Sequence, residues 1–151
     1  MKKIVAVIGG NVCKNNKIKK IAFETGREIA LRGHVLLCGG MGGVMEESCR
    51  GARSVNGLTI GILPGKNLSD ANKFVDIPIL TAMSHARNAI IVRSADFVIA
   101  VDGEYGTLSE IALAKSIEKI VFGIQTWDIK GVVKVRDAKE ALSLYEKMKI
   151  K

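Results

Sequence analysis

The chain has 151 residues, of which 48% are hydrophobic and only two are proline, so it is long enough for one folded domain and extended disorder is excluded. Its formal charge of +8 would suit a polyanionic partner. However, aromatic residues make up only 5% and are not interleaved with the lysines, which favours solvated helix faces over a nucleic-acid surface.

Strand and helix patterns alternate along the chain. The first apolar run, residues 3–8, faintly resembles a signal peptide, but it leads into Gly9 and Gly10 without a cleavage pattern, so we interpret it as a strand of a cytoplasmic protein. The other predicted strands span Val35–Cys38 and residues 58–63, 74–79, 96–101, 119–124 and 132–135. The predicted helices span residues 17–32, 44–54, 81–94, 107–118 and 137–149.

The order of these elements predicts the fold class. Alternating strands and helices with short turns indicate an α/β protein with one doubly wound, mostly parallel sheet of the Rossmann-like type. No linker rich in Gly, Ser and Pro interrupts residues 1–151, so we expect a single domain. Charges interrupt every apolar stretch that approaches the roughly 18 residues of a transmembrane helix, so no membrane span is predicted.

The cysteine and histidine residues do not indicate a metal site. Cys13, Cys38 and Cys49 are odd in number and lack C-x-x-C spacing. Cys38 ends a predicted strand, which favours a buried reduced thiol. His34 and His85 are too few and too far apart for a metal cluster.

Three turns rich in small residues follow predicted strands and should open on one edge of the sheet. They are Gly9-Gly10-Asn11, Gly39-Gly40-Met41-Gly42-Gly43, and Gly103 with Gly106. Any one of them is explained by a positive φ or a close helix–strand contact, whereas three at one edge predict a binding crevice for nucleotide phosphate. The first turn lacks G-x-G-x-x-G, and no acidic residue follows Val35–Cys38, which argues against NAD binding. The sequence also has no P-loop motif, which argues against a P-loop NTPase.

Residues 102–110 lie between a buried strand and the start of a helix. Free backbone N–H groups in such a turn, together with the positive end of the helix dipole, attract phosphate or carboxylate. The stretch therefore predicts an anion-binding corner. Thr107-x-x-Glu110 is also the pattern of a capping box, in which Glu110 would only satisfy the Thr107 amide.

Together these motifs resemble the Lonely Guy superfamily, long mislabelled as lysine decarboxylases, over residues 3 to about 125. Residues 102–110 are similar to its P-G-G-x-G-T-x-x-E motif, residues 39–45 to its glycine turn followed by G-[LV]-M, and residues 84–88 to its arginine-bearing helix. Residues 42–46 and 105–112 match a short-chain branch that is often described as molybdenum cofactor carrier-like and as related to DNA-processing proteins.

In hydrolytic members, the resemblance implies cleavage of the N-glycosidic bond of a nucleoside 5′-monophosphate, with Arg87 and Glu110 as the catalytic pair. A carboxylate can stabilise the oxocarbenium-like state of ribosyl transfer, and a guanidinium can fix that carboxylate or a substrate oxygen. The phosphate- and nucleotide-binding residues expected from the turns and the resemblance are Gly9, Gly10, Gly39, Gly40, Gly43, Met45, Gly103, Tyr105, Gly106 and Thr107. A homodimer or larger assembly is also implied, with no required cofactor and no metal ligands in the chain.

The chain departs from the hydrolytic pattern in two places. Asp102-Gly103-Glu104 replaces Pro-Gly-Gly, and each carboxylate near a phosphate would cost on the order of 1–4 kcal/mol at about 4 Å. Glu104 also replaces a glycine that adopts positive φ freely. Met41 stands where the branch usually has glycine. These changes are compatible with phosphate binding if a Mg²⁺ ion bridges the phosphate and the carboxylates, or if the carboxylates point away from the site. A different ligand would also explain them.

Three functions stay open on the sequence. The first is a nucleotide-binding protein that acts as a phosphoribohydrolase. The second is a non-catalytic carrier of a phosphate-bearing cofactor such as a molybdopterin. The third, a DNA-associated protein, rests only on the charge of +8 and the distant DNA-processing kinship.

Overall fold

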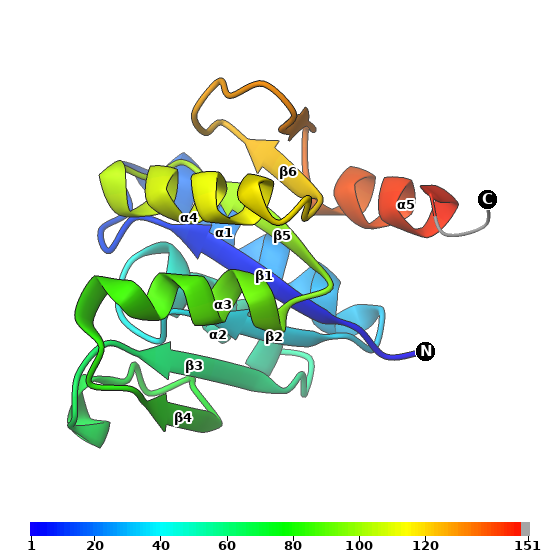
Figure 1. Ribbon diagram of the computed structural model, residues 1–151. Coiled ribbons are helices and arrows are strands. Elements are labelled where there is room, and N and C mark those ends of the chain that lie inside the picture. Colours follow the sequence, from blue (N-terminus) through cyan, green and yellow to red (C-terminus); the bar gives the residue numbers. More distant parts are fainter. Residues whose placement is uncertain (149–151) are drawn as a thin grey trace.

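Seven parallel strands form the centre of the molecule (Figure 1). The computed structural model describes residues 1–148. The strands are β1 (Ile4–Gly9), β2 (Val35–Cys38), β3 (Thr59–Leu63), β4 (Ile77–Leu80), β5 (Phe97–Val101), β6 (Val121–Ile124) and β7 (Val133–Lys134). Their order in the sheet is β4-β3-β2-β1-β5-β6-β7, so the direction of winding reverses between β1 and β5. The predicted doubly wound, Rossmann-like fold is confirmed.

Helices cover both faces of the sheet (Figure 1). They are α1 (Asn16–Leu31), α2 (Val44–Arg53), α3 (Asn88–Ser94), α4 (Tyr105–Ser116) and α5 (Ala138–Met148). One apolar cluster packs α1, α2 and α5 against one face, and a second packs α3 and α4 against the other. Because both faces are covered, the strands are apolar throughout rather than alternating, as expected of a parallel sheet.

The helix starts follow local capping chemistry. The side chain of Asn15 accepts a 2.9 Å hydrogen bond from the Ile18 amide and so caps α1. Asp137 likewise accepts from the Glu140 amide before α5, while the Glu140 carboxylate accepts from the amide of Arg136. The predicted α5 start is thus confirmed. The predicted end at Lys149 lies outside the described residues.

The segment between β3 and α3 differs most from the prediction. The strand expected over residues 74–79 begins only at Ile77, because a turn occupies residues 72–75, in which the amides of Phe74 and Val75 donate to the side-chain and carbonyl oxygens of Asn72. The helix expected over residues 81–94 is shorter, since Ala82 and Ser84 have φ of 54° and 52°, which a right-handed helix does not allow. A 3-10 turn at Ser84–Arg87 leads into α3 instead.

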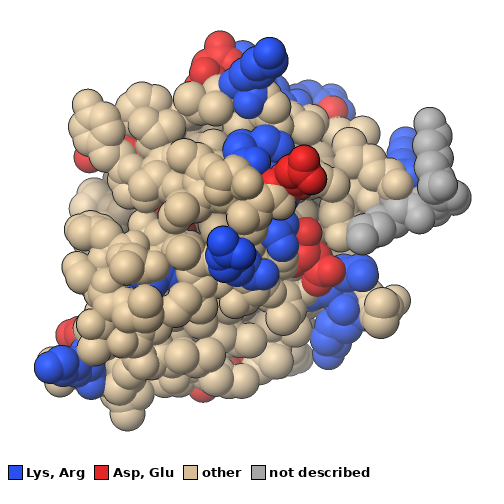
Figure 2. Space-filling model, viewed as in Figure 1, with Lys and Arg blue, Asp and Glu red and all other residues tan. Residues whose placement is uncertain are grey.

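Charge is unevenly distributed over the surface. Figure 2 shows the face formed by α3 and α4, on which uncharged side chains predominate. In the basic cluster at residues 14–20, Lys14 pairs with Asp102 and Lys19 with Glu47. Part of the positive charge is therefore neutralised within the molecule. No helix among residues 1–148 is long and apolar enough to cross a membrane.

Candidate functional site

A pocket of about 510 Å³ opens at the carboxyl ends of β1 and β5, where the strand order reverses. This is where parallel α/β sheets bind their ligands. All three predicted glycine turns contribute to it. The predicted site residues that line it are Gly9, Gly10, Gly39, Met45, Arg87, Gly103, Gly106, Thr107 and Glu110.

Three other predicted residues do not line the pocket. Gly40 and Gly43, with φ of 78° and 59°, shape the turn between β2 and α2 from behind. The side chain of Tyr105 is 79% exposed and lies beside Trp127 on the surface, with ring centroids 5.8 Å apart. Their contact with a ligand therefore stays a prediction that the pocket lining does not support directly.

Close backbone approach explains two of the glycines. A Cβ on Gly9 would lie 2.6 Å from the carbonyl oxygen of Val101, and one on Gly103 would overlap the side chain of Thr107. Any side chain at these positions would push β1 away from β5 or fill the corner at the start of α4. Glycine at these two positions therefore lets the backbone segments approach closely beside the pocket.

The corner at the start of α4 contains backbone N–H groups that have no backbone acceptor among the described residues. The first hydrogen bond of the helix runs from the Leu108 amide to the carbonyl oxygen of Glu104, so the amides of Tyr105, Gly106 and Thr107 precede it without a backbone acceptor. Gly106 and Thr107 line the pocket. The corner thus presents N–H groups and the positive end of the α4 dipole to the pocket.

The capping-box alternative for Thr107 and Glu110 is wrong. Helix α4 begins two residues earlier than predicted, with Glu104 at its N-cap position, so Thr107 already lies inside the helix. The positive φ of the turn falls on Asp102 (49°) and Gly103 (99°), whereas Glu104 has φ of −118°. The expected strain at Glu104 is therefore absent, and Glu110 is left to line the pocket.

Arg87 is buried at the inner end of the pocket, with only 8% of the residue exposed. One terminal nitrogen donates to the Asn88 side-chain oxygen, and the other donates to the Gly39 carbonyl oxygen at 3.4 Å, near the limit for a hydrogen bond. Its Nε is completely buried and has no hydrogen-bond partner among residues 1–148. Arg87 also forms no ion pair with a described residue, and a buried charge of this kind is costly unless a ligand supplies a negative charge.

Glu110 lies at the same inner end and is 7% exposed. Its carboxyl group forms no hydrogen bond or ion pair with any of the residues 1–148. Burial raises its pKa to about 8, although the charge of Arg87 acts in the opposite direction. Burial in turn lowers the pKa of Arg87, which Glu110 opposes. Glu110 is therefore mostly neutral at pH 7 and can donate a hydrogen bond.

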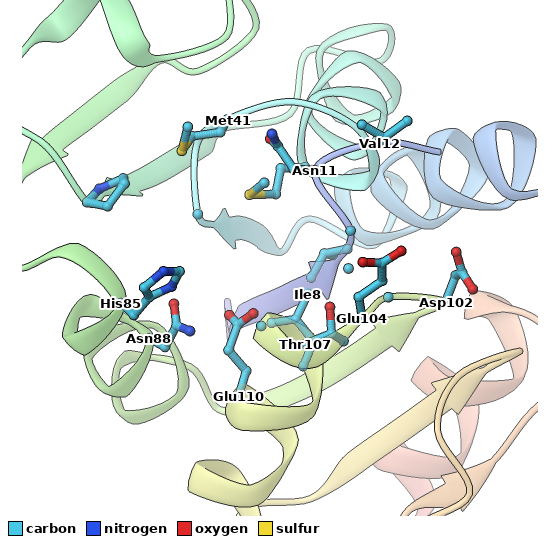
Figure 3. Close-up of a pocket in the computed structure, with 18 of the residues that line it drawn as sticks. Ile8, Asn11, Val12, Met41, His85, Asn88, Asp102, Glu104, Thr107 and Glu110 are labelled. Atoms are coloured by element: carbon cyan, nitrogen blue, oxygen red, sulfur yellow. The ribbon is translucent and has the colours of Figure 1, made fainter. Parts of the chain in front are cut away.

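The outer end of the pocket is exposed and ion-paired. Lys14 lies 3.1 Å from the Asp102 carboxylate, and its side chain is 53% exposed. Figure 3 shows that Glu104 lies between Glu110 and Asp102 in this view. Glu104 is exposed and has no ion pair within residues 1–148. Of the two carboxylates that depart from the family pattern, one is thus neutralised and one is free.

The turn that carries Met41 closes the opposite wall of the pocket (Figure 3). Two asparagines hold it: the Asn11 side chain accepts from the Gly42 amide at 3.0 Å, and the Asn72 side chain donates to the Met41 carbonyl oxygen at 2.8 Å. Met41 therefore presents its thioether to the pocket from a fixed backbone. An apolar, polarizable side chain suits a flat ring better than a phosphate group.

Sequence reasoning gave no site role to five polar residues that line the pocket: Asn11, Lys14, Ser84, His85 and Asn88. Asn11 follows the first glycine pair directly, and Asn88 follows Arg87, so proximity to predicted site residues was the available signal. His85 was given no role, but Figure 3 places its ring across the pocket from Met41. Among the described residues, no group of three or more His, Cys, Asp or Glu side chains could hold a metal ion.

Behind the pocket wall, Cys38 is fully buried, which confirms the expected buried thiol. Its sulfur lies 3.5 Å from that of Cys49 and accepts from the Gly40 amide. The hydrogen bond with Cys49 lowers the pKa of Cys38 and raises that of Cys49. The pair packs the end of β2 against α2 and so supports the Gly39 turn.

Known proteins resemble this chain over most of its length. The solved structure of a molybdenum cofactor binding protein from Rippkaea orientalis is 38% identical, with a TM-score of 0.92 over 98% of both chains. A protein of Archaeoglobus fulgidus is 52% identical over 110 residues, which are 73% of this chain and 72% of the relative.

A more distant relative is a probable cytokinin riboside 5′-monophosphate phosphoribohydrolase of Oryza sativa subsp. japonica. It is 29% identical over 115 residues, or 73% of this chain, but the match covers only 50% of the rice protein. The model of the SLOG cluster4 family matches residues 2–150. The resemblance to the Lonely Guy superfamily is thereby confirmed, and the chain belongs to the SLOG cluster4 family.

Proposed function

We propose that this protein binds a phosphate-bearing small molecule in the pocket and acts as a carrier of a cofactor of the molybdopterin kind. The observation that carries the proposal is Arg87, a buried guanidinium that lines the pocket and forms no ion pair with any of the residues 1–148. An anionic ligand would supply the missing negative charge.

The phosphate fits the corner at the start of α4. The amides of Gly106 and Thr107 have no backbone acceptor there, and the helix dipole favours a negative charge. Gly103 leaves room for close approach. The remainder of the ligand would then extend past Glu110 and Arg87 toward Met41 and His85, where the wall suits a flat ring.

Two observations favour a carrier over an unaltered hydrolase. Glu110, with its pKa raised to about 8 by burial, is mostly neutral at pH 7 and is better suited to hold a ligand by a hydrogen bond than to stabilise a cation. The similarity to the molybdenum cofactor binding protein extends over 98% of both chains, whereas that to the rice phosphoribohydrolase covers half of the relative.

Isothermal titration and thermal unfolding with four ligands test the proposal. We expect molybdopterin and AMP to bind and to raise the melting temperature, inorganic phosphate to bind more weakly, and adenosine, which lacks the phosphate, not to bind. Adenosine binding as tightly as AMP, or the absence of binding by every phosphate-bearing ligand, would overturn it.

A second function, hydrolysis of a nucleoside 5′-monophosphate, is favoured by one observation: Arg87 and Glu110 lie together in the pocket. A neutral Glu110 could give its proton to the leaving base while water attacks C1′ of the ribose, and the water proton would then restore the acid. The products would be the free base and ribose 5-phosphate. The activity would be established if the unsubstituted protein releases free base from AMP and Glu110→Gln does not. If the protein binds AMP but releases no base, the result supports the carrier function.

The remaining expectations stay predictions. They are the cytoplasmic location, the homodimer or larger assembly, and a Mg²⁺ ion that bridges the phosphate and a carboxylate. For the ion, Glu104 is the candidate ligand, because Asp102 already pairs with Lys14.

A further inference from the structure

A chain of hydrogen bonds joins Arg87 to the corner at the start of α4. The Arg87 guanidinium donates to the side-chain oxygen of Asn88. The Asn88 side-chain nitrogen donates to the Ser109 hydroxyl at 3.1 Å, and this hydroxyl donates to the Gly106 carbonyl oxygen at 2.7 Å. We call Arg87, Asn88, Ser109 and the Gly106 carbonyl the relay. Its two middle members, Asn88 and Ser109, each accept a hydrogen bond from the group before and donate one to the group after.

The hydrogen bonds end on a peptide group at the start of α4. The Gly106 carbonyl belongs to the same peptide unit as the Thr107 amide, which has no backbone acceptor among the described residues, and Thr107 is one of the residues that line the pocket. Donation to a carbonyl oxygen polarises the peptide group and makes its N–H a stronger donor. The positive charge of Arg87 at the other end increases this polarisation, because every link points the same way.

We propose that Asn88 and Ser109 are positioning residues that couple Arg87 to the Thr107 amide, so that one phosphate-bearing ligand is bound by both ends of the relay. This inference rests on the proposed function. Asn88 orients the guanidinium, and Ser109 strengthens the Thr107 donor. Neither residue needs to touch the ligand for this effect.

The placement of both residues fits this role. Asn88 is 2% exposed, and both polar atoms of its side chain are used within the relay. Apart from the bond to Asn88, the one hydrogen bond that the Arg87 side chain makes within residues 1–148 is the 3.4 Å bond to the Gly39 carbonyl oxygen. Without Asn88 the guanidinium would have no firm anchor and would lose orientation toward the pocket.

Helix α4 offers a matched control for Ser109. Ser116 donates to the Leu113 carbonyl oxygen at 2.7 Å, the same local bond that Ser109 makes to Gly106, but near the other end of the helix. Both serines are exposed. Ser109→Ala and Ser116→Ala therefore remove the same local interaction, and only the first interrupts the relay.

The experiment measures affinity for AMP and for inorganic phosphate by titration calorimetry, with the Thr107 amide proton followed by NMR in the free protein. We expect Ser109→Ala to weaken binding by about two- to four-fold and to shift the Thr107 proton upfield, while Ser116→Ala changes neither. Asn88→Ala should weaken binding by about ten-fold, and the double variant Asn88→Ala, Ser109→Ala should weaken it by less than the product of the two single effects.

Two results would overturn the relay: equal affinities and Thr107 shifts in Ser109→Ala and Ser116→Ala, or fully multiplicative effects in the double variant. If Asn88→Ala does not fold, the serine pair still decides the question. Failure of the proposed function would give a different result from failure of the relay, because the unsubstituted protein itself would then bind neither AMP nor phosphate.

Discussion

The two ends of the pocket differ in the burial and pairing of their ionisable side chains. At the inner end Arg87 and Glu110 are buried, and neither forms an ion pair with a described residue. At the outer end Lys14 and Asp102 form a direct ion pair, and the lysine is half exposed. The charge of Arg87 and the neutral carboxyl group of Glu110 are thus left for a ligand, whereas the charges of Lys14 and Asp102 are largely satisfied by each other and by solvent.

This contrast predicts how strongly substitutions at each end of the pocket affect stability and binding. A buried charge or carboxyl group without partners destabilises the fold, so its presence at the inner end is explained by what it binds. An exposed ion pair contributes little to stability and can be changed with little effect. Substitutions at the inner end should therefore change both stability and binding strongly, and those at the outer end should change both weakly.

The largest expected effect is on stability, in Glu110→Gln. Because burial raises the folded-state pKa of Glu110 from 4.5 to about 8, the folded protein retains a proton that the unfolded chain releases above pH 4.5. The stability associated with this proton is fully present below pH 4.5 and is lost as pH rises to about 8, at about 1.4 kcal/mol per pH unit. Glutamine stays neutral and avoids this loss.

Urea unfolding between pH 5 and 9 measures the difference. We expect Glu110→Gln and the unsubstituted protein to have similar free energies of unfolding near pH 5, with the variant more stable by several kcal/mol at pH 9. Glu118→Gln, a change in an exposed residue beyond the end of the same helix, serves as the control. Parallel profiles for Glu110→Gln and Glu118→Gln would contradict a buried neutral carboxyl group.

The next largest effect is on binding, in Arg87→Ala. Loss of a charge-assisted contact to a bound anion should weaken the affinity for AMP by about 100-fold, measured by titration calorimetry. Arg93→Ala removes an exposed arginine from the following helix and should leave the affinity within two-fold. Equal losses in the two variants would mean that Arg87 acts only through the general charge of the protein.

The sequence was sufficient to predict the layout of the site. Strand and helix periodicity identified the doubly wound sheet, and the glycine turns after β1, β2 and β5 located the pocket, because the carboxyl ends of parallel strands must meet. Gly9 and Gly103 could be identified because only glycine allows the backbone contacts found there. These features depend on local patterns that recur in all such folds.

What could not be predicted depends on neighbours distant in the sequence. Arg87 would ordinarily be a solvated arginine, but it is enclosed by the Gly39 turn, 48 residues earlier. The bond between Asn88 and Ser109 spans 21 residues and arises only when α3 packs beside α4. The sequence left two roles for Glu110, a helix cap or a site residue, because the choice depended on where α4 begins. In the structure Glu104, and not Thr107, occupies the N-cap position of α4.

A smaller effect is expected at Glu104, the exposed carboxylate without an ion pair. Glu104→Gln removes a like charge near the phosphate corner and should tighten AMP binding by about two- to five-fold without Mg²⁺. If a Mg²⁺ ion bridges Glu104 and the phosphate, adding Mg²⁺ should tighten binding by the unsubstituted protein and not by Glu104→Gln. Titrations with and without the ion measure both effects, and an equal response to Mg²⁺ in the two proteins would exclude the bridge.

The smallest effect is expected for Lys14→Ala at the outer end. The ion pair with Asp102 is 3.1 Å long, but Lys14 is exposed, so its loss should lower the free energy of unfolding by less than about 1 kcal/mol. Removal of the lysine leaves the Asp102 charge uncompensated near the phosphate, which should weaken AMP binding by about two- to three-fold. Because salt screens exposed charges, this loss should shrink between 0.05 and 0.5 M NaCl, roughly the range over which screening becomes strong. A loss as large as that of Arg87→Ala, and insensitive to salt, would show that the outer end binds the ligand as tightly as the inner end does.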